Sequence, residues 1–138
     1  MLDTTTRAGA AAAARLETAV TIMLTTVSPT GQPQASPVWF LWVDNEFLVY
    51  SLAKALRIRN IEANPRVTIN LDSNGHGGGV VSVEGDARID LEAPSAAATP
   101  TLIAKYRPQL DEYGWTVERY SADYPIAIRI RPTRWRVG

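Results

Sequence analysis

The stretch that decides the fold is Val38-Trp39-Phe40-Leu41-Trp42-Val43, six consecutive apolar residues within the segment 35–43. A strand with one face in water alternates apolar and polar residues, so an unbroken apolar run needs cover on both faces. We expect the interior of a barrel on one side and a partner surface on the other. Trp39 and Trp42 would point to opposite faces of this one strand, one into the core and the other toward a dimer seam or pocket.

The segments on either side of this run are also typical of strands. Residues 19–27 mix branched apolar residues with threonines, and residues 28–31 supply a turn. Asp44-Asn45 makes the next turn, and residues 46–51 return as a further strand. The run therefore belongs to a hairpin whose two strands are both largely buried.

Three more strands follow later in the chain. Residues 66–71 form one, and residues 80–90 alternate apolar with polar side chains over their whole length. Residues 126–131 alternate in the same way, and we expect Pro132 to bend or break that strand before Trp135. Helices are predicted for the segments 8–18, 52–63, 95–106 and 112–121.

This order of elements predicts a single domain over residues 1–138, mainly β, folded as a six-stranded split β-barrel with short connecting helices. Fourteen basic residues balance fourteen acidic ones, which argues against a nucleic-acid or membrane-surface partner. The chain has no cysteine and one histidine, so no metal site is expected. No signal or membrane-spanning segment is evident, and a cytoplasmic protein is expected.

The segment 50–60, Tyr-Ser-Leu-Ala-Lys-Ala-Leu-Arg-Ile-Arg-Asn, is the best candidate for a binding site. A strand ends at Ser51 and a helix begins, and a helix start offers free N–H groups with a partial positive charge. Lys54 and Arg57 are three residues apart and would share a helix face. This pattern suits a phosphate held by Ser51, Lys54 and Arg57. From composition alone, a solvated basic face fits equally well.

Other motifs carry less information. The segment 75–79 is glycine-rich, but it matches neither common phosphate-loop pattern and precedes a strand, so we interpret it as a flexible connection with His76 at the surface. No pair of carboxylates suggests acid–base catalysis, and no catalytic residue is assigned. If the protein is an enzyme, its cofactor carries the reaction.

The chain resembles the pyridoxamine 5'-phosphate oxidase-like split barrels. The segments 24–33 and 36–40 resemble the opening strands of that family, and 49–67 resembles its phosphate-binding segment. Glu84-Gly85-Asp86-Ala87 and the segment 130–135 resemble later strands. The longer arginine-rich motif and the C-terminal substrate segment of true pyridoxamine-phosphate oxidases are not found, which argues against vitamin B6 oxidation.

The resemblance implies a homodimer with a phosphorylated cofactor in a groove between subunits. Residues Ser36, Pro37, Val38 and Trp39 would pass along the flavin ring. The phosphate end would face Tyr50, Ser51, Lys54, Arg57 and Asn60. Trp135 of the second subunit would close the ring site.

The segment 54–60 and the Ala/Arg-rich composition are similar to the actinobacterial deazaflavin-dependent branch. That similarity implies an oxidoreductase that transfers hydride from coenzyme F-420 to a small organic substrate. An FMN-binding oxidase or reductase of the same fold is an alternative, and a cofactor-binding protein without turnover is a third.

Overall fold

The structure of the chain, a computed structural model, describes all residues from 1 to 138. It is mainly β, and none of its helices has the length and apolar character needed to cross a bilayer. In chain order the elements are α1 (Arg7–Thr18), β1 (Ile22–Val27), β2 (Pro33–Val38), β3 (Leu41–Val43), β4 (Glu46–Ser51), α2 (Leu56–Ala63), β5 (Arg66–Asn70), β6 (Val81–Ile89), the 3₁₀ turn η1 (Ala96–Ala98), α3 (Pro100–Tyr113), α4 (Val117–Asp123) and β7 (Ile126–Val137).

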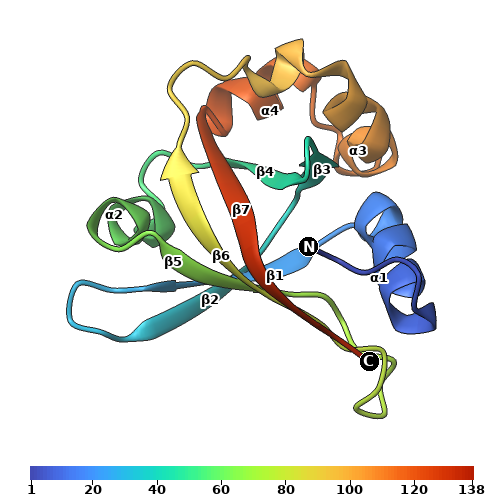
Figure 1. Cartoon of the computed structure of the whole chain (residues 1–138). Coiled ribbons are helices and arrows are strands. Elements are labelled where there is room, and N and C mark those ends of the chain that lie inside the picture. Colours follow the sequence, from blue (N-terminus) through green and yellow to red (C-terminus); the bar gives the residue numbers. More distant parts are fainter.

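The seven strands form one antiparallel sheet in the order β2-β1-β5-β6-β7-β4-β3. β2 and β3 lie at opposite edges of this sheet, although only Trp39 and Phe40 separate them in the chain. A connection of that length spans roughly 11 Å at most, so the sheet has to curl until its two edges approach each other. Figure 1 shows the resulting curled half-barrel, with α3 and α4 over one end.

This topology corrects one prediction. The segment 35–43 is not one strand, because the chain leaves β2 after Val38 and enters β3 at Leu41. The interruption makes seven strands where six were predicted. Its physical reason is that the chain crosses here from one edge of the sheet to the other, and neither edge can bond to the two crossing residues.

The backbone of Phe40 at this crossing is bonded by side chains of α3 instead of by a strand. The Phe40 N–H donates to the Tyr106 hydroxyl at 2.8 Å, and that hydroxyl donates to the Val20 carbonyl at 2.6 Å. Lys105 Nζ donates to the Phe40 carbonyl at 2.9 Å and lies 3.6 Å above the centre of the Phe40 ring. Because buried peptide groups need partners, these bonds fix α3 to the crossing.

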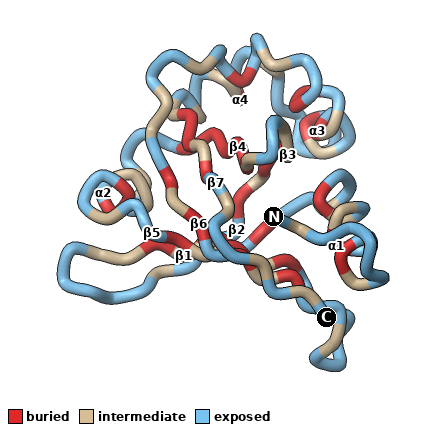
Figure 2. Tube along the Cα trace, in the orientation of Figure 1, coloured by how far each residue is buried: buried red, intermediate tan, exposed pale blue.

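β4 is buried on both faces and separates two hydrophobic clusters. Phe47 and Val49 point into the barrel, whereas Leu48 and Tyr50 pack beneath α3 and α4 with Tyr106. Figure 2 shows β4 buried between the barrel and this helical layer. The neighbouring apolar run also contributes to both clusters, so the chain's own helices supply the cover that was predicted to come from a partner. The run is therefore no evidence for a dimer.

The predicted helices are confirmed in kind, with shifted bounds. The segment 8–18 corresponds to α1, but 52–63 becomes helical only at Leu56, after a turn. The segments 95–106 and 112–121 correspond to η1, α3 and α4, but the predicted break between them is wrong. Helix α3 runs without interruption from Pro100 to Tyr113 and stops before Gly114, which has a φ of 69°. Proline in the first turn and glycine after the last one are common helix boundaries.

The last strand is longer than predicted. β7 continues through Pro132 to Val137, and Pro132 neither breaks nor ends it. The ladder to β6 shifts its register between Glu84 and Gly85, and Gly85 pairs with Pro132. A bulge accommodates a residue that cannot donate to the ladder. A Cβ at Gly85 would lie 2.9 Å from the Arg131 carbonyl oxygen, so this close approach requires glycine.

We expect Tyr106→Phe to lower the free energy of unfolding by about 1–3 kcal/mol, because it leaves the buried Phe40 N–H without a partner. Urea denaturation measures this. Tyr113→Phe, at an exposed position, is the control and should change stability by less than about 0.5 kcal/mol. Equal effects of the two substitutions would contradict the role of the Tyr106 hydroxyl.

Lys105 should make stability depend on pH. Burial lowers the pKa of Lys105 from 10.5 to about 8. Between these two values the unfolded chain binds the proton that the folded chain has lost, so stability should rise as the pH increases from about 8 to 10.5. Denaturation across this range should show that rise in the wild type and a smaller one in Lys105→Met. Identical slopes of stability against pH in the two proteins would contradict the role of Lys105.

Candidate functional site

Arg57 lies at the centre of the candidate site. Its Nη1 donates to Ser51 Oγ at 2.8 Å and its Nη2 donates to Ser36 Oγ at 3.1 Å. Its Nε is buried and has no hydrogen-bond partner. None of the ion pairs in the chain includes Arg57. The guanidinium is therefore half-buried, with its charge unbalanced and its buried Nε–H unused.

Three elements bring these groups together. Ser51 is the last residue of β4 and is fully buried, Ser36 lies in the edge strand β2, and Arg57 lies in the first turn of α2. The N-cap of α2 is Ala55, which has no side chain able to bond the first turn. The start of the helix thus keeps free N–H groups beside the guanidinium, an arrangement that favours an anion.

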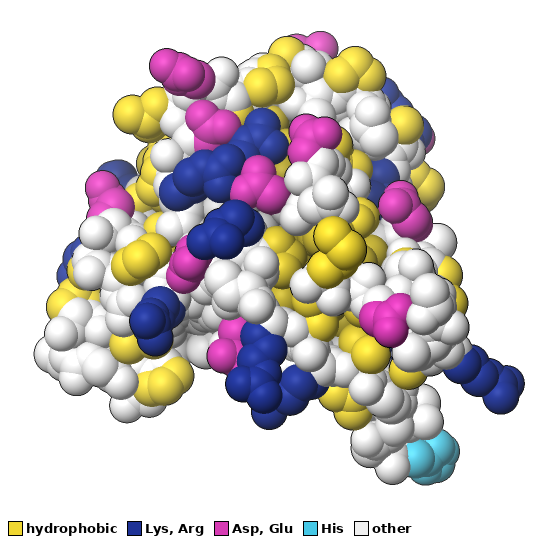
Figure 3. All heavy atoms as spheres, in the orientation of Figure 1, with side chains coloured by type: hydrophobic (Ala, Val, Ile, Leu, Met, Phe, Trp, Pro, Cys, Tyr) yellow, Lys and Arg dark blue, Asp and Glu magenta, His cyan; other side chains and the backbone are white.

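The electrostatics of Arg57 differ from those of the paired arginines on the sheet surface. Burial lowers the pKa of Arg57, and the neighbouring Tyr124 offsets this only in part. On the surface, Figure 3 shows basic and acidic side chains interspersed over β6 and β7. There Arg129 bonds Asp90 at 2.7 Å and Arg131 bonds Asp86 at 3.0 Å. Those charges are compensated within the chain, whereas the charge of Arg57 is not.

A cavity of about 270 Å³ opens next to Arg57. One wall is the Trp39 indole, which stacks on Tyr106 with the ring centres 4.4 Å apart and the planes 6° from parallel. Most of the remaining lining is apolar or aromatic, and it comes from β2, the end of β4 and the stretch from the end of α3 to the residue after α4. The lining residues are Thr21, Pro37, Val38, Trp39, Tyr50, Leu52, Arg57, Tyr113, Trp115, Tyr120 and Tyr124.

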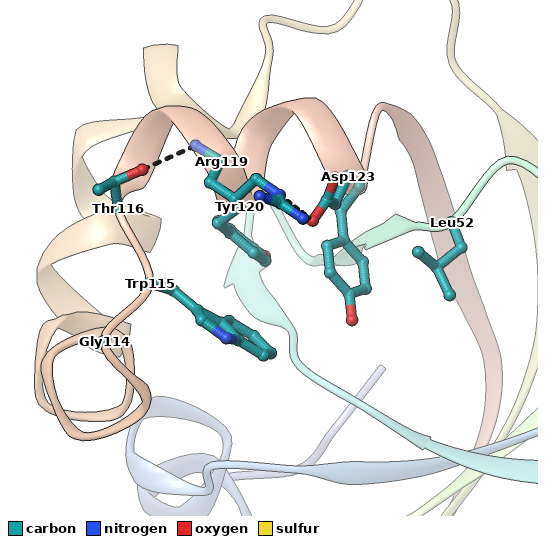
Figure 4. Close-up of a pocket in the computed structure, with 8 residues that line it drawn as sticks. Leu52, Gly114, Trp115, Thr116, Arg119, Tyr120 and Asp123 are labelled. Atoms are coloured by element: carbon teal, nitrogen blue, oxygen red, sulfur yellow. Dashed lines mark hydrogen bonds and ion pairs between the residues drawn. The ribbon is translucent and has the colours of Figure 1, made fainter.

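A second cavity, of about 540 Å³, adjoins the first one beneath α4. The two share Leu52, Trp115, Tyr120 and Tyr124. Figure 4 shows Tyr120 descending from α4 toward the Trp115 indole, with Leu52 on the opposite side. We call these the Arg57 cavity and the α4 cavity. Together they form one aromatic-lined cleft with a single unpaired cation at one end.

The structure brings most of the predicted site residues together. The Arg57 cavity and the bonds of its guanidinium unite Ser36, Pro37, Val38, Trp39, Tyr50, Ser51 and Arg57. The Tyr50 hydroxyl is already bonded to the Pro94 carbonyl at 2.7 Å, so this residue offers its ring.

The structure corrects the predicted position of Lys54. It lies in the turn before α2 and is exposed, so it does not share a helix face with Arg57 as predicted. The helix starts two residues after Lys54, and the side chain lines neither cavity.

Asn60 is completely buried and lines neither cavity. Its amide donates to Thr26 Oγ1 at 2.9 Å and to Gln34 Oε1 at 2.8 Å, while its own Oδ1 has no partner. It therefore ties α2 to β1 and β2, and in this way it supports Arg57, which lies one turn earlier in the helix.

Trp135 lies away from both cavities of its own chain. It packs edge-on against Trp42, with ring centres 5.7 Å apart, in a groove near the N-terminus. The position of Trp135 within its own chain does not test the prediction that Trp135 of a second subunit closes the site.

The aromatic residues contributed by α3 and α4 were not predicted as site residues. Tyr113, Trp115, Tyr120 and Tyr124 fall within twelve residues of sequence, and this density was the available signal. It could not be used, because aromatic residues of helices normally pack into a core. Only the curled sheet shows that this segment faces the end of β4.

Comparison with known proteins gives a family and a fold. The family model described as Pyridoxamine 5'-phosphate oxidase matches residues 8–137. Among solved structures, an F-420 reductase is 27% identical with a TM-score of 0.65, and the match covers 89% of this chain and 94% of that one. No curated protein matches.

Two further structures extend the likeness. A conserved hypothetical protein from Mycobacterium tuberculosis is 25% identical with a TM-score of 0.73, covering 93% of this chain and 82% of that one. HutZ, a heme storage protein from Vibrio cholerae, is 18% identical with a TM-score of 0.68, covering 96% and 95%. At that identity it shows the fold alone. The predicted split-barrel fold is confirmed.

Inorganic phosphate should stabilise the wild type through Arg57. A ligand that binds only the folded chain at ten times its Kd adds about 1.4 kcal/mol, which thermal unfolding detects as a higher Tm. Arg57→Met should lose this gain while the ligand-free protein stays as stable as the wild type or becomes more stable, because a desolvated charge has been removed. Lys54→Met is the matched control and should keep most of the gain. Loss of the gain in both variants would contradict the assignment to Arg57.

Proposed function

This chain belongs to the pyridoxamine 5'-phosphate oxidase family, and we propose that it is an oxidoreductase that uses coenzyme F-420. The phosphate of the cofactor binds at Arg57, Ser51 and the start of α2, and the deazaflavin ring lies along residues 36–39 in the Arg57 cavity. The 27% identity to an F-420 reductase over nearly the whole chain supports this choice of cofactor.

The observation that carries the proposal is the state of Arg57. Keeping a guanidinium half-buried without a carboxylate costs free energy, and its unused Nε has no partner in the folded chain. A phosphate in the Arg57 cavity would balance this charge and accept hydrogen bonds from the guanidinium. A surface arginine that merely faces water would show neither feature.

The remaining lining suits the rest of such a cofactor. The Trp39 indole cannot swing freely, because it is stacked on Tyr106, whose hydroxyl is bonded to the backbone at the crossing. It forms a rigid wall against which a planar ring system can lie. When bound, the reduced deazaflavin supplies the hydride. The chain's own residues bind the phosphate, orient the ring and keep water from the aromatic part of the cleft.

FMN is the second candidate. It also has a phosphate next to a polyol and a planar ring, so the unpaired Arg57 favours both cofactors. Heme storage, the role named for HutZ, has less support in this chain. The only histidine, His76, is exposed in the loop 72–79, and neither cavity offers an imidazole to a heme iron.

Separate titrations with coenzyme F-420 and FMN test the cofactor. We expect the absorption and fluorescence of coenzyme F-420 to change at micromolar protein, with FMN binding more weakly. The reduced cofactor should then be oxidised when a suitable organic acceptor is added. If neither cofactor binds at micromolar protein, the proposed function is wrong. If both bind without any turnover over a panel of acceptors, the protein is a carrier.

The protein is also proposed to be a homodimer, in accord with the implication of the family resemblance. A groove on the outer side of the sheet is lined by polar side chains of four strands, including Thr25, Thr68, Glu84 and Thr133. Sedimentation velocity should give twice the mass of the 15.1 kDa chain at micromolar concentration. A monomer at that concentration would contradict the proposal.

A further inference from the structure

The α4 cavity differs from the Arg57 cavity in its charge. Its only cation, Arg119, is already bonded to Asp123 through Nε at 2.9 Å, one turn along α4. Figure 4 shows this pair on α4 above the aromatic side chains. The only unpaired positive charge in the cleft is therefore that of Arg57, and an anion binds there. The α4 cavity suits an uncharged molecule.

The side chains of the α4 cavity favour a flat molecule. Its two aromatic residues Trp115 and Tyr120 both pack against Trp39 of the adjoining Arg57 cavity, with ring centres 6.0 and 5.3 Å away. Trp115 also has its ring centre 5.1 Å from that of Tyr113. Trp115 is 40% exposed, which is unusual for a tryptophan with aromatic neighbours on two sides. A planar ring system placed here would cover the exposed indole face and stack on it.

One polar group inside this aromatic lining has no partner. Tyr120 is only 3% exposed, yet its hydroxyl takes part in none of the hydrogen bonds of the chain, whereas the hydroxyls of Tyr50 and Tyr106 both do. Both cavities are lined by Tyr120. Burial raises the pKa of Tyr120, so the phenol keeps its proton and acts as a donor. The hydroxyl oxygen itself is not enclosed by the chain, because the enclosed polar atoms without a partner belong to Arg57, Asn60 and Gln109. It therefore opens into the space that Tyr120 lines and is free to donate to an acceptor oxygen of a ligand.

We propose that the α4 cavity is a binding site for a planar, uncharged aromatic carbonyl compound, stacked on Trp115 and held through its carbonyl oxygen by the Tyr120 hydroxyl. That this compound is the hydride acceptor rests on the proposed function. The binding of this compound does not depend on the proposed function, because Tyr120 and Trp115 are in place without any cofactor. The assignment makes Tyr120 the residue that selects a carbonyl compound over a hydrocarbon of the same shape.

A matched pair of probes tests the site on the cofactor-free chain. Equilibrium dialysis gives the Kd of 9-fluorenone and of fluorene, which share one ring system and differ in the carbonyl group. Tyr120→Phe should weaken fluorenone binding about fivefold, as expected for one neutral hydrogen bond, and should leave fluorene unchanged. The substitution breaks no bond within the chain, so folding is preserved. Glu118→Gln, on α4 but outside the lining of both cavities, is the control and should alter neither Kd.

Equal weakening of both probes by Tyr120→Phe, or no weakening of either, would overturn the proposal, and so would a wild-type chain that binds neither probe. Repeating the dialysis with saturating coenzyme F-420 tests whether the site is separate. Fluorenone affinity that is kept or increased supports a separate site, whereas competition would show that the cofactor ring itself fills the α4 cavity. Failure of coenzyme F-420 to bind would count against the proposed function and leave the first comparison decisive for Tyr120.

Discussion

The constraint on which the rest of this structure depends is the two-residue connection between the opposite edges of the sheet. Trp39 and Phe40 join β2 to β3, so the sheet has to curl, and the backbone of Phe40 has to find partners outside any strand. Tyr106 and Lys105 provide them, and in doing so they fix α3 over one end of the barrel. The stacking of Trp39 on Tyr106 is a direct consequence of this arrangement. The same connection thus closes the barrel and supplies Trp39 as the wall of the cleft.

The same arrangement explains why an uncompensated arginine can persist next to this wall. β4 is buried between two hydrophobic clusters, and its last residue, Ser51, emerges where the barrel, α2 and the α3–α4 segment meet. No acidic side chain contributes to the Arg57 cavity, so Arg57 bonds to two serine hydroxyls and keeps its net charge. Such a group lowers the stability of the free protein and is useful only when an anion is bound. The cleft therefore has a charged end and an uncharged aromatic end.

Much of this could be predicted from local sequence. The alternation in residues 80–90 predicted β6, and the Asp44-Asn45 turn predicted the β3–β4 hairpin. The segment after Ser51 predicted Arg57 as the cation of the site. What failed depends on long-range geometry. A continuous apolar run cannot reveal that the chain changes sheet edge in its middle, and helix propensity over residues 52–55 cannot reveal the turn that leaves Lys54 outside α2. Tyr120 and Trp115 were missed because only the tertiary structure sets α4 against the end of β4.

The central claim is that Arg57 recognises a phosphate in the cleft, and the most direct measurement is a comparison of two ligands in two proteins. The affinities of the wild type and of Arg57→Met are measured for coenzyme F-420 and for the same deazaflavin without its phosphate-bearing tail. The account predicts that the wild type binds the complete cofactor at least tenfold more tightly and that Arg57→Met binds the two ligands almost equally. A preference for the complete cofactor that survives in Arg57→Met would contradict it.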